Sequence, residues 1–153
     1  MQVFYLSKNA FQTKRIGRKF AKEVLKKEGL KKAFIIGLSG DLGGGKTTFL
    51  QGFAVGLGIK EKVLSPTFVI MRKHEIKNRS FLNKKQFCHF DCYRISKPKE
   101  ILSIDFKKNI SDPQNIIAIE WAERVKSFLP KDVIWIKFDF VDKNTRKIIF
   151  KNR

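Results

Sequence analysis

The sequence predicts a single α/β domain over residues 1–153, with a mostly parallel sheet, helices on both faces of the sheet and an antiparallel C-terminal hairpin. Three observations lead to this prediction. The length of 153 residues and the 42% content of hydrophobic residues suit one domain around one core. An apolar run, a glycine-rich loop and an amphipathic segment follow one another over residues 33–58, in the order strand, turn and helix. Two strand-like segments flank a short polar turn near the end of the chain.

The first half of the chain carries two helical patterns with a strand between them. Apolar residues recur at helical spacing over residues 9–28, and Gly29 is a natural stop for this helix. The run AFIIGL (33–38) is almost wholly apolar, as is typical of a strand buried on both faces of a sheet. The helical pattern returns after the glycine loop and ends near Gly58, so we expect a second helix there.

The second half of the chain is richer in strand patterns. VLSPTFVIM (63–71) and QFCHFDCYRI (86–95) are strand-like, and the basic, turn-rich segment between them makes the pair a hairpin or a mobile excursion. The remaining expected elements are a helix opened by Pro98 over 98–107, a buried strand over 116–120, a short helix over 121–129, and a hairpin at the sheet edge with strands over 133–140 and 145–150.

The charge is strongly positive, because 33 Lys and Arg residues stand against 14 Asp and Glu residues and leave a formal net charge of +19. A surface that meets RNA or acidic partners would have such a charge. A compositional bias towards lysine, isoleucine, phenylalanine and asparagine, with the charges spread over solvated faces, would give such a charge too. The basic residues are scattered along the sequence, and no aromatic residues alternate with them as in a single-strand binding groove. Contact with nucleic acid within a larger assembly therefore stays open.

The apolar and cysteine patterns indicate neither membrane insertion nor a structural metal site. No apolar run approaches the ~20 residues that cross a bilayer, and the N-terminal segment lacks the basic, apolar and small-residue order of a secretory signal. Cys88 and Cys92 form a lone C-x3-C without the second ligand pair of a zinc site. We therefore expect a cytoplasmic protein with two free thiols.

Residues 40–47, GDLGGGKT, match the motif G-x-x-x-x-G-K-[ST] in full, between a buried strand and a helix. Glycine backbones can turn several N–H groups into a nest for anionic oxygens, and the N-terminal end of the following helix adds positive potential. In such a loop the lysine reaches the β- and γ-phosphates, and the next hydroxyl binds Mg²⁺. The sequence predicts a P-loop that binds a nucleoside triphosphate through Asp41, Leu42, Gly43, Gly44, Gly45, Lys46, Thr47 and Thr48.

Hydrolysis would also need a carboxylate on a neighbouring strand to orient a metal ion or a water molecule. Glu120 ends the apolar run IIAIE, so it would lie at the C-terminal edge, where open α/β sheets bind ligands. Asp91 ends QFCHFD, with His89 two residues earlier on the same face. For Glu120 the alternative is a surface acid at a strand end. For Asp91 the alternative is a turn residue or a salt bridge with Arg94.

ATP is the expected nucleotide. GTP-specific loops need an N-K-x-D element, and the nearest string, NKKQ over residues 83–86, ends in glutamine. Two other functions stay open. A small-molecule kinase would need a substrate lid with paired arginines, for which 153 residues leave little room. A non-enzymatic, basic RNA-binding module would use the loop only to hold tRNA phosphates.

Four strings in order, GDLGGGKTTF, SPTF, HFDCYR and IEWAER, resemble the TsaE (YjeE) family of bacterial P-loop ATPases, from about residue 10 to the C-terminal hairpin. The first string is common to many NTPases, whereas H-F-D-x-Y-R followed by I-E-W is much more specific. The resemblance implies ATP hydrolysis in association with the TsaD and TsaB proteins, which make the threonylcarbamoyl modification of adenosine beside the anticodon of tRNA. Hydrolysis would support or reset that complex without itself transferring the group, and contact with tRNA through the complex stays open.

The resemblance also implies roles for individual residues. The catalytic group would comprise Lys46, Asp91 and Glu120, with Thr47 and Glu120 holding Mg²⁺ and Asp91 acting on water or on coupling to the partners. The other implied residues are Ser65 and Thr67 as a switch-like pair facing the γ-phosphate, Trp121 as an aromatic beside the site, and Phe11 and Arg146 as flanks of the adenine.

The chain departs from the family pattern in three places. Gly44 stands where the family commonly has alanine and is compatible with the phosphate nest, and Cys92 stands where leucine is usual, which indicates a structural thiol. The segment 100–110 lacks the glycine of the family pattern, which bears on a local turn and on partner contact. No arginine finger is evident within the chain, and Arg94 and Arg124 are the candidates. We therefore expect the in-line attack of water on ATP to be slow without the partner proteins.

Overall fold

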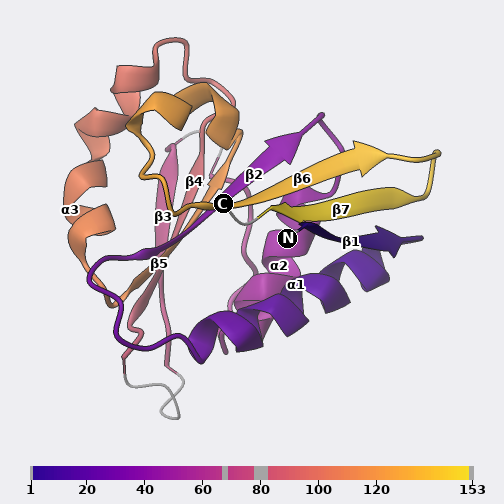
Figure 1. Ribbon diagram of the computed structural model, residues 1–153, viewed down its shortest axis with the longest axis horizontal. Helices are drawn as coiled ribbons and strands as arrows, with labels where there is room; N and C mark the ends of the chain where they lie inside the picture. The colour runs from indigo at the N-terminus through magenta and orange to yellow at the C-terminus, as the bar shows by residue number, and fades with distance from the viewer. Residues whose placement is uncertain (1, 67–68, 78–82, 152–153) are drawn as a thin grey trace.

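The computed structural model describes residues 2–66, 69–77 and 83–151, and in this part of the chain the strands form one seven-stranded sheet (Figure 1). In sequence order the strands are β1 (Gln2–Ser7), β2 (Phe34–Gly40), β3 (Met71–Glu75), β4 (Gln86–Asp91), β5 (Asn115–Glu120), β6 (Ile134–Phe140) and β7 (Arg146–Lys151). Across the sheet their order is β1-β7-β6-β2-β5-β4-β3. The central strands β6, β2, β5 and β4 are parallel, and antiparallel strands flank them on both sides.

Helices cover both faces of this sheet. The helices α1 (Ala10–Leu25) and α2 (Lys46–Gly56) pack on one face, and the other face carries α3 (Phe106–Ser111) with the 3-10 helices η1 (Pro98–Ile104) and η2 (Ala122–Phe128) (Figure 1). Alternate side chains of β2 and β5 enter one hydrophobic core or the other, which explains why both strands are apolar throughout. The predicted α/β architecture is therefore confirmed. Among the described residues, no helix has the length and apolar content needed to cross a membrane.

The register of the parallel strands brings three chain segments to one edge of the sheet. Glu120, the last residue of β5, is paired with Asp91 at the end of β4 and with Leu38 near the end of β2. The loop that leads from β2 into α2 therefore leaves the sheet beside both carboxylates. In open α/β sheets, ligands bind at this edge, beyond the carboxyl ends of the strands.

Glycines allow α1 and α2 to lie directly against each other. A Cβ atom at Gly52 of α2 would lie 2.0 Å from the carbonyl oxygen of Lys14, and one at Gly17 of α1 would lie 2.2 Å from the carbonyl oxygen of Phe49. Real Cβ atoms essentially never approach another heavy atom within 3.0 Å. The two helix backbones are therefore in contact, and this contact fixes α2, whose first residues form the end of the glycine loop.

We expect Gly52→Ala to destabilise the protein by about 2 kcal/mol or more, although alanine favours helices. The added methyl group would overlap the backbone of α1, which cannot move aside as a flexible side chain can. Thermal unfolding should show a fall in Tm of about 4 °C or more for a chain of this length. Gly29→Ala is the control: Gly29 has φ +68°, but a Cβ atom there would have no neighbour within 4 Å, so only about 1 kcal/mol of backbone strain is expected. Equal losses in the two variants would contradict the backbone contact.

The N-terminal strand β1 is absent from the sequence-based prediction. Its four consecutive apolar residues, VFYL, show no alternation, and five of its six residues are exposed. Its only strand partner in the described residues is β7, near the other end of the chain. No local sequence pattern therefore predicts β1. The hairpin of β6 and β7 forms as predicted, but β1 covers β7 and is itself the edge of the sheet.

Two predicted elements differ in their bounds. The strand predicted over 63–71 is wrong for its described residues 63–66, 69 and 70, because β3 begins only at Met71. Pro66 cannot donate to a strand ladder, and Ile70 has φ +61°, which is outside the strand conformation. The helix predicted over 98–107 is divided into η1 and α3, because Asp105 between them has φ +54°. The antiparallel pairing of β3 with β4 agrees with the predicted hairpin.

Both cysteines are buried free thiols, as expected from the sequence. Burial raises the pKa of Cys88 to about 11 and the pKa of Cys92 to about 12. At neutral pH both side chains are therefore protonated thiols, and the thiolate form that reacts as a nucleophile is scarce. Both residues pack in the hydrophobic core on the face of the sheet that carries α3.

Candidate nucleotide-binding site

The loop of residues 40–45 joins β2 to α2 in a conformation that requires glycine. Gly40 and Gly45 have φ values of +135° and +99°, in the region that other residues disfavour. A Cβ atom at Gly40 would also lie 2.4 Å from the carbonyl oxygen of Phe138. Gly45 is the N-cap of α2 and provides no side-chain cap. The first N–H groups of α2 therefore keep their capacity to bind an anionic ligand.

A cavity of about 350 Å³ lies over this loop, at the edge of the sheet where β4 and β5 end. Its walls come from the glycine loop and the start of α2 on one side, and from the ends of β4 and β5 with the following residues on the other. The lining residues are Leu42, Gly43, Gly44, Gly45, Lys46, Thr47, Thr48, Ser65, Asp91, Tyr93, Glu120 and Trp121.

Lys46 brings a positive charge into this cavity although its side chain is almost fully buried. Its Nζ atom donates hydrogen bonds to the carbonyl oxygens of Gly40 (2.5 Å) and Asp41 (2.8 Å). It also lies 4.2 Å from the ring centroid of Trp121, close enough for a cation–π contact. Burial lowers the pKa of Lys46, and the nearby negative charges, that of Glu120 first, partly oppose this effect. The Lys46 ammonium group is held mainly by carbonyl dipoles, so the negative charge of a phosphate ligand would stabilise it strongly.

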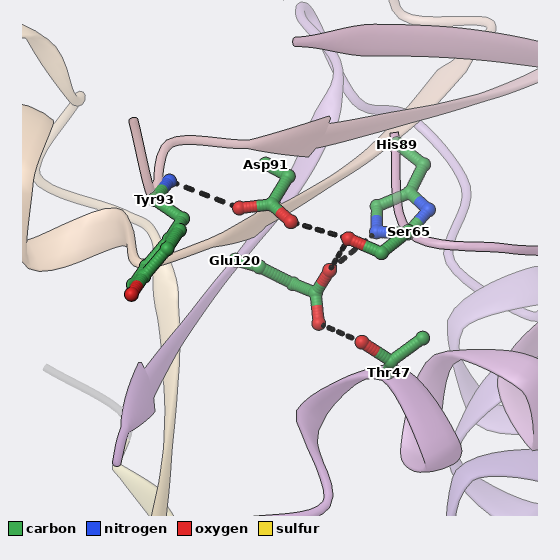
Figure 2. A network of polar contacts seen from close by, with 6 residues as sticks. All are labelled: Thr47, Ser65, His89, Asp91, Tyr93 and Glu120. Carbon is green, nitrogen blue, oxygen red and sulfur yellow. Dashed lines mark hydrogen bonds and ion pairs between the residues drawn. The ribbon is translucent and has the colours of Figure 1, made fainter. Parts of the chain in front are cut away.

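Glu120 is the buried carboxylate at the centre of the site (Figure 2). Its Oε1 atom accepts a hydrogen bond from Thr47 Oγ1 at 2.6 Å, and its Oε2 atom lies 3.0 Å from His89 Nε2. Burial raises the pKa of Glu120, but the hydrogen bond and charge of His89, the hydrogen bond of Thr47 and the charge of Lys46 outweigh it and lower the pKa overall. The group is thus a carboxylate at neutral pH. Because a carboxylate can only accept, the His89 Nε2 atom carries the hydrogen of their contact.

Asp91 forms the second half of the same polar network. Ser65 Oγ donates a short hydrogen bond to Asp91 Oδ2 and lies 3.4 Å from Glu120 Oε2, so this hydroxyl stands between the two acids (Figure 2). The other oxygen of Asp91 accepts a hydrogen bond from the backbone N–H of Tyr93 at 2.9 Å. The segment before β3, which carries Ser65, is thereby tied to the ends of β4 and β5.

The structure brings most of the predicted site residues to this one cavity and separates a few from it. Lys46, Thr47, Asp91 and Glu120 all line it, as do Ser65 and Trp121 and the loop residues 42–45 and 48. Asp41 contributes to the site through its carbonyl oxygen, which accepts a hydrogen bond from Lys46 Nζ. Arg146 lies beside the loop, with Nη2 3.4 Å from the Gly43 carbonyl oxygen, whereas Phe11 lines a separate cavity between α1 and α2. Thr67 lies outside the described residues.

His89 and Tyr93 are the contributors that the sequence-based prediction does not assign to the site. The alternation of β4 places His89 on the same face as Asp91, but its contact with Glu120 depends on β4 lying next to β5, which no local pattern shows.

Trp121 has φ +58° immediately after β5, and this turn directs its indole towards Lys46. Arg124, a candidate arginine finger, donates to the Tyr93 carbonyl oxygen at 2.5 Å and is absent from the lining of the cavity among the described residues.

The donor groups of the site fit Mg²⁺. The ion prefers oxygen ligands and usually takes only one or two protein groups together with substrate phosphates and water. Thr47 Oγ1 and Glu120 Oε1, 2.6 Å apart, are such a pair at the foot of the cavity. Among the described residues, no three His, Cys, Asp or Glu side chains are grouped to hold a metal ion by themselves. The ion would therefore bind together with a phosphate ligand.

Comparison with known proteins gives a consistent result. Residues 7–148 match the family model of the threonylcarbamoyl adenosine biosynthesis protein TsaE. The tRNA threonylcarbamoyladenosine biosynthesis protein TsaE of Haemophilus influenzae is 35% identical over 132 residues, which are 86% of this chain and 78% of that protein. The protein of the same name from Bacillus subtilis is 36% identical over 116 residues, covering 76% of this chain and 68% of that protein.

A solved structure is similar over nearly the whole chain. The crystal structure of YdiB from Bacillus subtilis matches with a TM-score of 0.71 and 26% sequence identity, covering 99% of this chain and 86% of that one. The similarity extends through the hairpin and the N-terminal strand, so it includes both flanks of the sheet. Because a family model matches most of its length and several relatives exceed 30% identity, the chain belongs to the TsaE family of tRNA threonylcarbamoyladenosine biosynthesis proteins.

Proposed function

We propose that this protein binds Mg²⁺–ATP in the cavity over the glycine loop and hydrolyses it as an accessory of the TsaD–TsaB pair. One observation carries the proposal. The hydroxyl of Thr47, at the start of α2, meets the carboxylate of Glu120, at the end of β5, next to a buried ammonium group. A phosphate nest, a lysine, a hydroxyl and an acid on the adjoining strand are the parts that triphosphate hydrolysis uses in P-loop proteins.

Each group of the site has a defined task in this reaction. The loop amides and Lys46 would bind the phosphate oxygens and offset the charge that develops on them as water attacks the γ-phosphorus. Thr47 and Glu120 would hold Mg²⁺, which supplies further neutralisation of that charge. Asp91 and Ser65 lie beside Glu120 and would position the water molecule. Water adds to phosphorus with the loss of a proton, the bond to the ADP oxygen breaks, and the products are ADP, phosphate and that proton.

The contacts of Arg124 support the proposal that the isolated protein hydrolyses ATP slowly. Its guanidinium group is bound to the Tyr93 carbonyl oxygen and lies 5.2 Å from the ring centroid of Trp121, and Arg124 is not among the described residues that line the cavity. A partner would then have to supply the missing positioning or positive charge. The cytoplasmic location expected from the sequence stays a prediction.

The test is ATP turnover by the purified protein with and without TsaD and TsaB. We expect release of free phosphate that is slow for the protein alone and at least about tenfold faster with both partners, since positioning groups supplied in trans have large effects in P-loop proteins. The amount of TsaD and TsaB that co-purifies with this protein should depend on ATP, and it should differ between the wild type and Glu120→Ala. Equal rates with and without the partners would contradict the accessory role. A phosphorylated small-molecule acceptor in place of free phosphate would instead support a kinase.

A further inference from the structure

The exposed side of α1 carries a row of basic residues that the proposed ATPase site does not use. We define the α1 basic face as Lys14, Arg15, Arg18, Lys19, Lys22 and Lys26, all of which are exposed. They recur at intervals of about four residues, so they lie along one side of the helix, opposite the buried residues that pack on the core. At 1.5 Å per residue they extend over roughly 18 Å.

Most charges of the α1 basic face have no ion pair with any described residue. Among the described residues, only Lys26 of the α1 basic face has an ion pair, with Glu23 at 3.0 Å. Glu23 is also the only acid of α1, and its first turn has none. Helices are stabilised by acids in the first turn and bases in the last, so bases as early as Lys14 and Arg15 do not serve the stability of the helix. Their excess charge is available to a ligand.

Part of the α1 basic face surrounds a hollow. A cavity of about 370 Å³ between α1 and α2 is lined by Lys14, Arg15 and Arg18, with Phe11, Gly52 and Val55 completing its walls. Gly52 forms the part of the wall where the backbones of the two helices touch. Three cations around one concave site attract an anion more strongly than the same charges on a convex surface, because concave low-dielectric walls focus the field.

From these observations we propose that the α1 basic face binds the phosphate backbone of RNA directly. A row of exposed cations roughly 18 Å long matches a polyanion with regularly spaced charges, and arginine and lysine are the residues that bind such phosphates. The identification of that RNA as tRNA rests on the proposed function, whereas the charge, exposure and hollow do not. RNA binding by the α1 basic face would explain part of the net charge of +19 by a function outside the nucleotide site.

The test measures binding of a fluorescently labelled, unmodified tRNA transcript to nucleotide-free protein by anisotropy, at several KCl concentrations. For the wild type we expect the logarithm of the affinity to fall with the logarithm of salt concentration with a slope of about −3, as for roughly three to four neutralised phosphates. Arg15→Gln/Arg18→Gln/Lys22→Gln should weaken binding at least about tenfold at low salt and reduce the slope by about 2.

The control removes the same number of charges from the opposite side of the sheet. Lys99→Gln/Lys107→Gln/Lys108→Gln changes three exposed lysines of η1 and α3 and should alter the affinity less than about threefold. Equal weakening by both triple variants, or no binding by the wild type at low salt, would overturn the proposal. So would equally strong competition by polyglutamate, which would assign the face to acidic polypeptides. Since the assay contains no ATP, failure of the proposed hydrolysis would leave its result unaffected.

Discussion

Replacement of Glu120 by glutamine is expected to lower the rate of ATP hydrolysis by at least about 100-fold while ATP still binds. Glutamine has nearly the same shape and can accept the hydrogen bond of Thr47, but it removes the negative charge that completes the proposed metal site. Loss of one such preorganised electrostatic group costs about 10²–10³ in rate in other enzymes. Binding would persist because the loop amides and Lys46, which grip the phosphates in our proposal, are unchanged.

The measurement combines phosphate release in the presence of TsaD and TsaB with titration of an ATP analogue. Glu123→Gln is the matched control, since it removes an exposed acid only three residues along the chain, and it should change the rate less than about twofold. Full activity of Glu120→Gln would contradict the assignment of the acid. An equal loss in Glu123→Gln would show that the region responds only to its total charge.

The parts of the site that lie close together in the sequence were predictable, and the contacts between distant segments were not. The glycine loop needs contiguous residues, so its motif and its place between a strand and a helix are visible in the sequence. Glu120 could be assigned to the ligand-binding edge because it ends an apolar strand pattern, and Asp91 could be placed at the end of another strand pattern. That they are register partners depends on β4 lying next to β5, and the contact of His89 with Glu120 depends on it too. The hydrogen bond of Ser65 to Asp91 depends instead on the segment before β3 lying beside the end of β4.

The same distinction explains the errors in the predicted fold. The strand β1 is stabilised by pairing with β7, which is distant in the sequence. Its apolar residues are consecutive and exposed, so the alternation of apolar and polar residues that identifies a half-buried strand is missing. Residues 63–66 contain β-formers, yet they are irregular because Ser65 is held by Asp91 and Pro66 cannot join a ladder. In both segments, tertiary contacts override the local propensity for structure.

Replacement of Lys46 by alanine is expected to weaken ATP binding by about 10- to 100-fold. A hydrogen bond to a charged group contributes about 1.5–3 kcal/mol, and each 1.4 kcal/mol corresponds to a factor of ten. Arginine should not restore binding, because its planar guanidinium group cannot replace a compact ammonium group held between two carbonyl oxygens and the Trp121 ring. The effect should therefore be nearly as large in Lys46→Arg as in Lys46→Ala.

Isothermal titration with ATP and Mg²⁺ would measure this effect directly. Lys60→Ala, which removes an exposed lysine beyond the C-terminal end of α2, is the control for net charge and should bind ATP within about twofold of the wild type. The two substitutions differ in burial and place but remove the same charge, so a difference between them reports on the loop itself. If Lys46→Ala bound ATP as tightly as the wild type, the triphosphate would not lie in the cavity over the glycine loop. The roles proposed for Thr47 and Glu120 would then have no substrate to act on.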